Sequence, residues 1–196
     1  MRDHKLFLLL SFVILFSGCA APFVTHEYFS PSSDGGKTIY TKCRGTSGPA
    51  DTIRFPVKSI YADVSASYYK NYMNISLSLK VPTYSVVIMS SKELTVISSS
   101  DSIKYKGKLE AKYSYPETSS WGVLRPIIGG AYKSQGHFAV KTYPKVYLLQ
   151  AKINMPEINN FIVRMPEFSV NDVKNTLSDI KFEKNKSVEY FPPFNC

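Results

Sequence analysis

The sequence is poor in the residues on which catalysis and metal binding most often depend. Its 196 residues include only three histidines and three cysteines. His26 lies near the amino terminus, and His137 has no Gly-x-Ser-x-Gly motif beside it to supply a nucleophile. No Cys-x-x-Cys pair, phosphate-binding glycine loop, calcium loop or four-ligand zinc set occurs. We therefore predict no catalytic residue, no metal and no cofactor.

Paired carboxylates that hydrolyse a glycan are the remaining catalytic option. The acidic residues are scattered over predicted strands and loops, at Asp63, Glu93, Asp101, Glu110, Glu157 and Glu167. Because no two of them stand out as a pair, a periplasmic hydrolase acting on a wall or lipid substrate remains an alternative and not the first hypothesis.

The chain also lacks a hydrophobic run long enough to cross a membrane. Residues 6–16 are eleven side chains, apolar except for Ser11, that follow the positively charged start 1–5. A helix across a hydrocarbon core of about 30 Å needs roughly 20 apolar residues. The run therefore predicts the hydrophobic region of an export signal.

A cysteine follows this run closely. Residues 16–19, Phe-Ser-Gly-Cys, resemble the lipobox of bacterial lipoproteins, with phenylalanine where leucine is usual. The resemblance implies removal of the signal peptide 1–18 and attachment of lipid to the thiolate of Cys19. Ala20, which is not aspartate, implies transfer to an outer membrane, facing the periplasm. The alternative is an ordinary secretory signal cleaved after Ala21, which leaves a soluble protein.

Two cysteines remain in the predicted exported chain. Cys43 opens the predicted domain, and Cys196 is the last residue. Because exported proteins occupy an oxidising compartment, we predict one disulfide between Cys43 and Cys196 that joins the ends of the domain. Two unpaired buried thiols are the alternative.

The net charge is +9, and acidic residues are missing altogether between Glu117 and Glu157. Since the chain is expected to be exported, we predict no nucleic-acid partner. The partners that fit are the membrane itself, through lipidated Cys19, and another envelope protein or an anionic lipid or glycan. Solubility alone also explains such lysines.

Alternating hydrophobic and polar residues dominate the rest of the chain. The alternation is complete over 74–81, and it continues over 102–115 around Gly107, which predicts a bend or bulge. Further predicted strands cover 38–42, 52–55, 64–69, 85–89, 94–98, 137–142, 146–153, 161–165, 180–183 and 187–190. These strands predict a single all-β domain over 39–196, an antiparallel β-sandwich that is immunoglobulin-like in the broad sense. A closed β-barrel is the alternative.

Two segments are expected to depart from this pattern. Prolines, glycines and serines over 19–38 predict a flexible tether between the anchor and the domain. Apolar residues at helical spacing, from Val170 to Ile180, predict one or two helical turns near 170–180.

Two surfaces are candidates for binding. The segment 116–136 has no clear period, and its candidate contact residues are Trp121, Arg125, Tyr132 and Lys133. The alternative is that its apolar side chains complete the core. The second surface is a lysine row made of Lys104, Lys106, Lys108 and Lys112. This row suits lipid phosphates, but we favour protection of an edge strand against aggregation.

Together these features predict a lipid-anchored, non-catalytic binding or envelope-assembly module. Besides the hydrolase, a carrier that encloses a lipid or other apolar ligand is an alternative. A carrier would need a continuous apolar cavity of roughly 300 Å³ or more.

Overall fold

The computed structural model describes residues 23–40, 42–43, 46–47, 49–58, 60–81, 86–114, 121–123, 126–127, 131–132 and 145–190. These residues form strands, turns and loops, and no helix occurs among them. The chain divides into two compact units, of which one is Tyr28–Asn185 and the other combines the segments on either side of it. The hydrophobic core belongs to the first unit.

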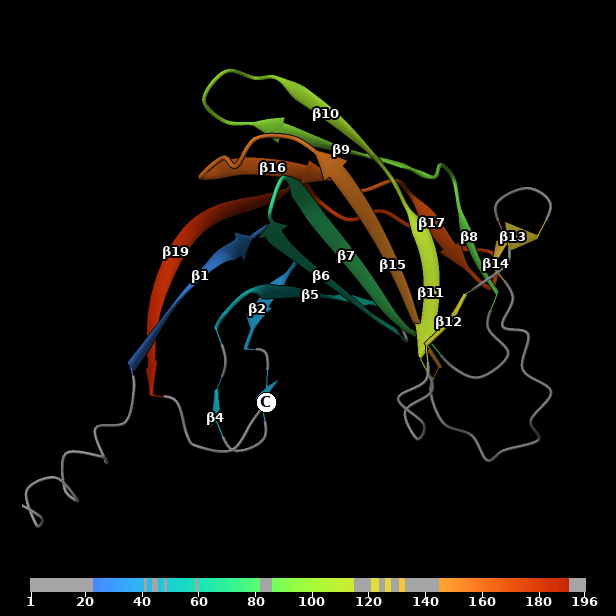
Figure 1. Ribbon diagram of the computed structural model, residues 1–196. Helices are drawn as coiled ribbons and strands as arrows, with labels where there is room; N and C mark the ends of the chain where they lie inside the picture. The colour runs from blue at the N-terminus through green and yellow to red at the C-terminus, as the bar shows by residue number, and fades with distance from the viewer. Residues whose placement is uncertain are drawn as a thin grey trace, which may run out of the picture. The chain divides into compact units, whose positions relative to one another are not determined.

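The strands form three larger sheets (Figure 1). Sheet A has the order β1 (Phe23–Ser32), β19 (Ile180–Tyr190), β16 (Asn160–Arg164), β9 (Glu93–Ser98), β10 (Lys104–Lys108). Sheet B has the order β12 (Trp121–Val123), β11 (Glu110–Ser114), β15 (Lys145–Asn154), β7 (Tyr72–Val81), β6 (Ile60–Tyr69), β5 (Thr52–Val57), β2 (Lys37–Ile39). Sheet C has the order β13 (Pro126–Ile127), β14 (Ala131–Tyr132), β8 (Val87–Met89), β17 (Phe168–Val170), β18 (Val173–Asn175), and β3 (Lys42–Cys43) pairs with β4 (Thr46–Ser47).

These sheets confirm the predicted fold class. The neighbouring strands β5, β6, β7, β15 and β11 pair antiparallel in register. None of the sheets closes on itself, so the described strands form an antiparallel β-sandwich and not the barrel that was the alternative.

The alternation in the sequence places one face of each main sheet in the core. On β7, Ile75, Leu77 and Leu79 are fully buried, whereas the serines between them face outward. Such a strand buries one face and leaves the other to solvent. The buried side chains of sheets A, B and C belong to one continuous hydrophobic cluster, as expected for a sandwich.

The long alternating segment 102–115 contributes to both main sheets. β10 pairs with β9 in sheet A, and β11 pairs with β15 in sheet B. Figure 1 shows β10 and β11 as consecutive yellow-green arrows. Leu109, between the two strands, is buried, so the chain passes from one sheet to the other with its apolar side still toward the core.

Gly107 is buried where β10 approaches β15. A Cβ atom added at Gly107 would lie 2.6 Å from Cγ1 of Ile153 and 3.2 Å from Cβ of Ala151. Its pairing with Leu94 continues the regular register of β10, so Gly107 is not a bulge in that ladder. Glycine is needed here because two strands of different sheets come close together.

Replacing Gly107 by valine is expected to lower the free energy of unfolding by about 1–3 kcal/mol, because the new side chain overpacks the contact with Ile153. Denaturant unfolding followed by circular dichroism measures this loss. Combining Gly107→Val with Ile153→Ala should cost less than the sum of the two single changes, since the second change makes room for the first. Wild-type stability of Gly107→Val would contradict this close approach.

The helical turns predicted near 170–180 are wrong. This segment contains the hairpin β17–β18, in which Val170 pairs with Val173. Asn171 and Asp172 form its two-residue turn, with φ angles of 47° and 65°. Two consecutive positive φ angles are typical of a type I′ hairpin turn, for which asparagine and aspartate are well suited. The local Asn-Asp turn therefore overrides the helical spacing of the apolar residues.

The structure also differs from the predicted tether. Residues 23–32 form β1, the edge strand of sheet A next to β19, and Phe29 on this strand is buried in the core. The ring of Phe29 lies 5.1 Å from that of Phe161 in an edge-to-face arrangement. Burial of the Phe29 ring stabilises this strand, even though turn-forming residues follow it. Residues 19–22 of the predicted tether lie outside the described residues.

Candidate functional site

The structure places part of the predicted lysine row at a sheet edge. Lys104, Lys106 and Lys108 are exposed on β10, the last of the described strands on that side of sheet A. Lys106 pairs with Glu93 across the ladder, with 3.2 Å between Nζ and Oε2. Lys112 lies on β11 in sheet B. An edge position fits the protective role that we favoured for Lys104, Lys106 and Lys108, whereas Lys112 lies on a strand that is paired on both sides.

The predicted contact residues of 116–136 are distributed over two sheets where they are described. Trp121 pairs with Ser114 in sheet B, and Tyr132 pairs with Val87 in sheet C. Arg125 and Lys133 lie outside the described residues, as do Cys19, His137 and Cys196. Cys43 lies on β3, and its predicted disulfide with Cys196 remains a prediction.

The outer face of sheet B carries a row of small polar side chains across five strands. Thr52, Ser65, Ser76, Gln150 and Glu110 stand opposite one another on β5, β6, β7, β15 and β11. Several of these groups bond to each other. The amides of Gln150 and Asn74 both donate to the hydroxyl of Ser76, each over 3.4 Å. The Oδ1 atom of Asn74 is buried and accepts no hydrogen bond.

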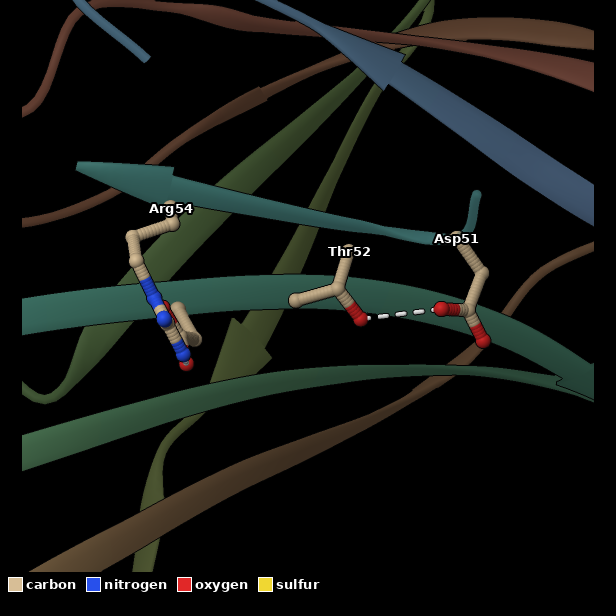
Figure 2. A network of polar contacts seen from close by, with 4 residues as sticks. Asp51, Thr52 and Arg54 are labelled. Atoms are coloured by element: carbon tan, nitrogen blue, oxygen red, sulfur yellow. Dashed lines mark hydrogen bonds and ion pairs between the residues drawn. The ribbon is translucent and has the colours of Figure 1, made fainter. Parts of the chain in front are cut away.

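The strongest polar contact of this face is a bidentate ion pair between β5 and β6. Arg54 Nε and Nη2 each donate to a carboxylate oxygen of Asp63 over 2.7 Å. These bonds raise the pKa of Arg54. The guanidinium also lies 5.1 Å from the centre of the Tyr61 ring. Figure 2 shows Arg54 on β5, together with the hydrogen bond from Thr52 to Asp51 at the start of that strand.

Some of the polar groups on this face of sheet B thus bond to one another, whereas the side chains of Ser65 and Glu110 have no hydrogen bond or ion pair with a described residue. Bonded groups of this kind stabilise the sheet surface and offer few free donors or acceptors to a ligand. A partly exposed pair such as Arg54–Asp63 contributes about 1 kcal/mol to folding. The bonded part of this face is therefore a structural surface.

A groove of about 400 Å³ lies on the outer face of sheet A. It is lined by Ser30, Ser32, Ser99, Asn160, Phe161, Ile162, Lys181, Phe182 and Glu183. The two phenylalanines are buried beneath it, and the other side chains face outward. The groove is therefore a polar depression above the aromatic part of the core.

The register of β16 and β19 sets the floor of the groove. Asn160 stands directly opposite Glu183, and Ile162 stands opposite Lys181. Such opposite residues have Cβ atoms about 5 Å apart. An amide therefore stands opposite a carboxylate at the first position, and an apolar side chain stands opposite an ammonium group at the next outward position.

The next outward pair of residues along these strands forms an ion pair. Arg164 on β16 donates from Nε and Nη2 to the two carboxylate oxygens of Asp179, over 3.0 and 2.6 Å. Hydrogen bonding from Arg164 lowers the pKa of Asp179. The hydroxyl of Ser33 donates to the backbone carbonyl of the same residue over 2.8 Å. This end of the groove is thus held by bonded groups.

The polar side chains within the groove have their hydrogen-bonding capacity free. Among the described residues, the side chains of Asn160, Lys181 and Glu183 make no hydrogen bond or ion pair with each other or with a neighbour. The hydroxyls of the three lining serines likewise have no partner in the described part of the chain. The groove therefore gathers six such polar side chains around one depression.

Several carboxylates of the described residues are bonded to basic side chains. Within the described ranges, no group of three or more His, Cys, Asp or Glu side chains is placed to hold a metal ion. Asp63 is paired with Arg54, and Glu157 accepts from Lys184 over 2.6 Å. Glu183 is the single carboxylate of the groove, so the groove offers binding groups and not a carboxylate pair.

Sequence reasoning did not find the groove. Ser30 and Ser32 fell in the predicted tether, Lys181 and Glu183 lay in the predicted strand 180–183, and Asn160 lay just before the predicted strand 161–165. The outward direction of these residues could be read from alternation, but the pairing of β16 with β19 could not. Comparison with family models, curated proteins and solved structures finds no match. In the part of the chain that is described, no helix has the length and hydropathy to span a membrane.

Proposed function

We propose that this protein is a lipid-anchored, non-catalytic binding module on the periplasmic face of a bacterial outer membrane. The groove on sheet A carries the binding part of the proposal, because its lining side chains have unused donors and acceptors on a solvent-facing surface. The resemblance of residues 16–19 to a lipobox supports the anchor at Cys19. An envelope module of this kind holds a component of the envelope close to the membrane without altering it.

The chemistry of the groove favours this function over the two alternatives. A carrier of apolar ligands is expected to enclose an apolar cavity, whereas six of the nine residues that line this groove are polar. A glycan hydrolase is expected to use two carboxylates, and Glu183 is the one carboxylate in the lining. We therefore retain binding as the proposed activity.

Retention on insoluble envelope material tests this function. The full-length lipoprotein, solubilised in a polyoxyethylene detergent, is mixed with detergent-washed envelope fragments and sedimented. We expect the wild-type protein to pellet with the fragments. Ser99→Trp should reduce the retained fraction about tenfold, because Ser99 is exposed and an indole at this position fills the groove.

The matched control is Ser67→Trp, the same change at an exposed serine on the outer face of sheet B. It should pellet like the wild type. No retention of the wild type, or equal retention of Ser99→Trp and wild type, would contradict a binding function for the groove.

A further inference from the structure

We infer that the groove on sheet A binds a neutral sugar, one or two rings of an envelope glycan. This inference rests on the proposed function, since it names the ligand class of the same groove. The lining provides one amide, one carboxylate, one ammonium group and three hydroxyls, none of them engaged by a neighbouring described residue. The ligand should therefore present several groups that both donate and accept hydrogen bonds. Sugar hydroxyls have this property.

The pair formed by Asn160 and Glu183 suits two adjacent hydroxyls of one ring. The two residues are directly opposite across β16 and β19, so their polar ends extend from points about 5 Å apart. A carboxylate accepts from hydroxyl groups, and an amide both donates and accepts. Hydrogen bonds to a charged acceptor are stronger than those between neutral groups. This pair should contribute most to the affinity.

The charges in the groove favour a neutral ligand. Lys181 and Glu183 are two residues apart on the same face of β19, and they bring one charge of each sign. The carboxylate of Glu183 would repel a phosphate, which disfavours phosphorylated ligands. The three serines and Asn160 outnumber the charged side chains, and their neutral dipoles suit an uncharged polar molecule.

The size of the groove and its one partly exposed apolar side chain agree with a sugar. Its volume of about 400 Å³ falls at the lower end of small-molecule sites, which span roughly 300–1,000 Å³. Ile162 lies in the floor beside Lys181 and is partly exposed. A pyranose ring has an apolar C–H face that can cover such a side chain while its hydroxyls reach the polar rows.

Saturation-transfer difference NMR with N,N′-diacetylchitobiose, a neutral disaccharide, tests the inference. The full-length lipoprotein is kept in polyoxyethylene detergent, which has no sugar headgroup to compete. We expect saturable binding with a Kd of about 1 mM, because a shallow groove offers few contacts. Asn160→Ala and Glu183→Ala should each raise the Kd about tenfold. Both positions are exposed, so the fold should persist.

Asn154→Ala and Glu110→Ala provide matched controls, because they make the same changes at exposed positions of sheet B. They should bind like the wild type. Inorganic phosphate and alanylalanine should not displace the disaccharide at equal concentration. The inference is overturned if the disaccharide gives no saturable signal, if the groove variants bind as tightly as the wild type, or if phosphate or the dipeptide displaces it.

The two proposals fail in different ways. Groove-dependent retention on envelope fragments without disaccharide binding would leave the binding function in place and show that the ligand class is wrong. Disaccharide binding without retention would support the groove as a sugar site and contradict its role in holding envelope material.

Discussion

Replacing Cys19 by serine is expected to remove the protein from the outer-membrane fraction. A diacylglycerol thioether needs the thiolate of cysteine, and a serine hydroxyl cannot provide one. A single acyl chain binds a bilayer only marginally, and two or more give stable anchoring. The wild type should therefore be recovered almost entirely with the outer membrane and the variant hardly at all. Density-gradient fractionation of cell envelopes measures this difference.

The control for this prediction is Cys196→Ser, which changes a cysteine outside the lipobox. This variant should stay with the outer membrane, whatever the change does to the predicted disulfide with Cys43. Mass spectrometry of the wild type should find lipid on residue 19 as the mature amino terminus. An unmodified amino terminus elsewhere, or membrane recovery of Cys19→Ser equal to that of the wild type, would refute the anchor.

Phe161→Ala is expected to be the most destabilising of the stability variants considered. Phe161 is 1% exposed and lies between two other rings of sheet A. Its ring centre is 5.1 Å from that of Phe29 and 5.2 Å from that of Phe182. Removing a buried phenylalanine costs about 3–5 kcal/mol, because apolar contacts are lost and a cavity remains. Urea unfolding followed by circular dichroism measures the loss.

A suitable control is Ile103→Ala, at a hydrophobic residue that is 48% exposed near the start of β10. Its free energy of unfolding should change by about 0.5 kcal/mol or less. Loss of stability in Phe161→Ala no greater than in Ile103→Ala would mean that the aromatic cluster is not part of the core. The position also matters to the groove, since Phe161 lies beneath it.

The sequence alone was sufficient for several of the main strands, such as 74–81, and for the direction of their side chains, but not for β1, β17 and β18. A period of two is a local property of each strand, and burial of one face requires it. This explains why the pattern over 74–81 correctly predicted that Ile75, Leu77 and Leu79 face the core. On 102–115 the alternation was correct at Leu109 and Ala111, which are buried although the segment changes sheets at Leu109, but not at Ile103, which is 48% exposed.

Local signals failed where residues distant in the sequence decide the structure. The tether was predicted from the turn-forming residues of 19–38. Residues of this segment instead form β1, because the ring of Phe29 packs against Phe161, which is remote in the sequence. The helix prediction followed spacing from Val170 onward, whereas the positive φ angles of Asn171 and Asp172 close a hairpin whose first strand, β17, pairs with β8. In the first case a long-range contact outweighs local propensity, whereas in the second a local Asn-Asp turn overrides the helical spacing.

The candidate site also depends on contacts between residues that are distant in the sequence. Alternation predicts that Asn160 and Glu183 point outward, but their side-by-side position depends on the register between β16 and β19. Ser30 and Ser99 reach the same groove from β1 and from the turn after β9. The sequence by itself thus determined the all-β fold, and export remains a prediction from residues 1–19. Only the tertiary structure decided which polar side chains meet, because strand pairing unites residues that no local pattern connects.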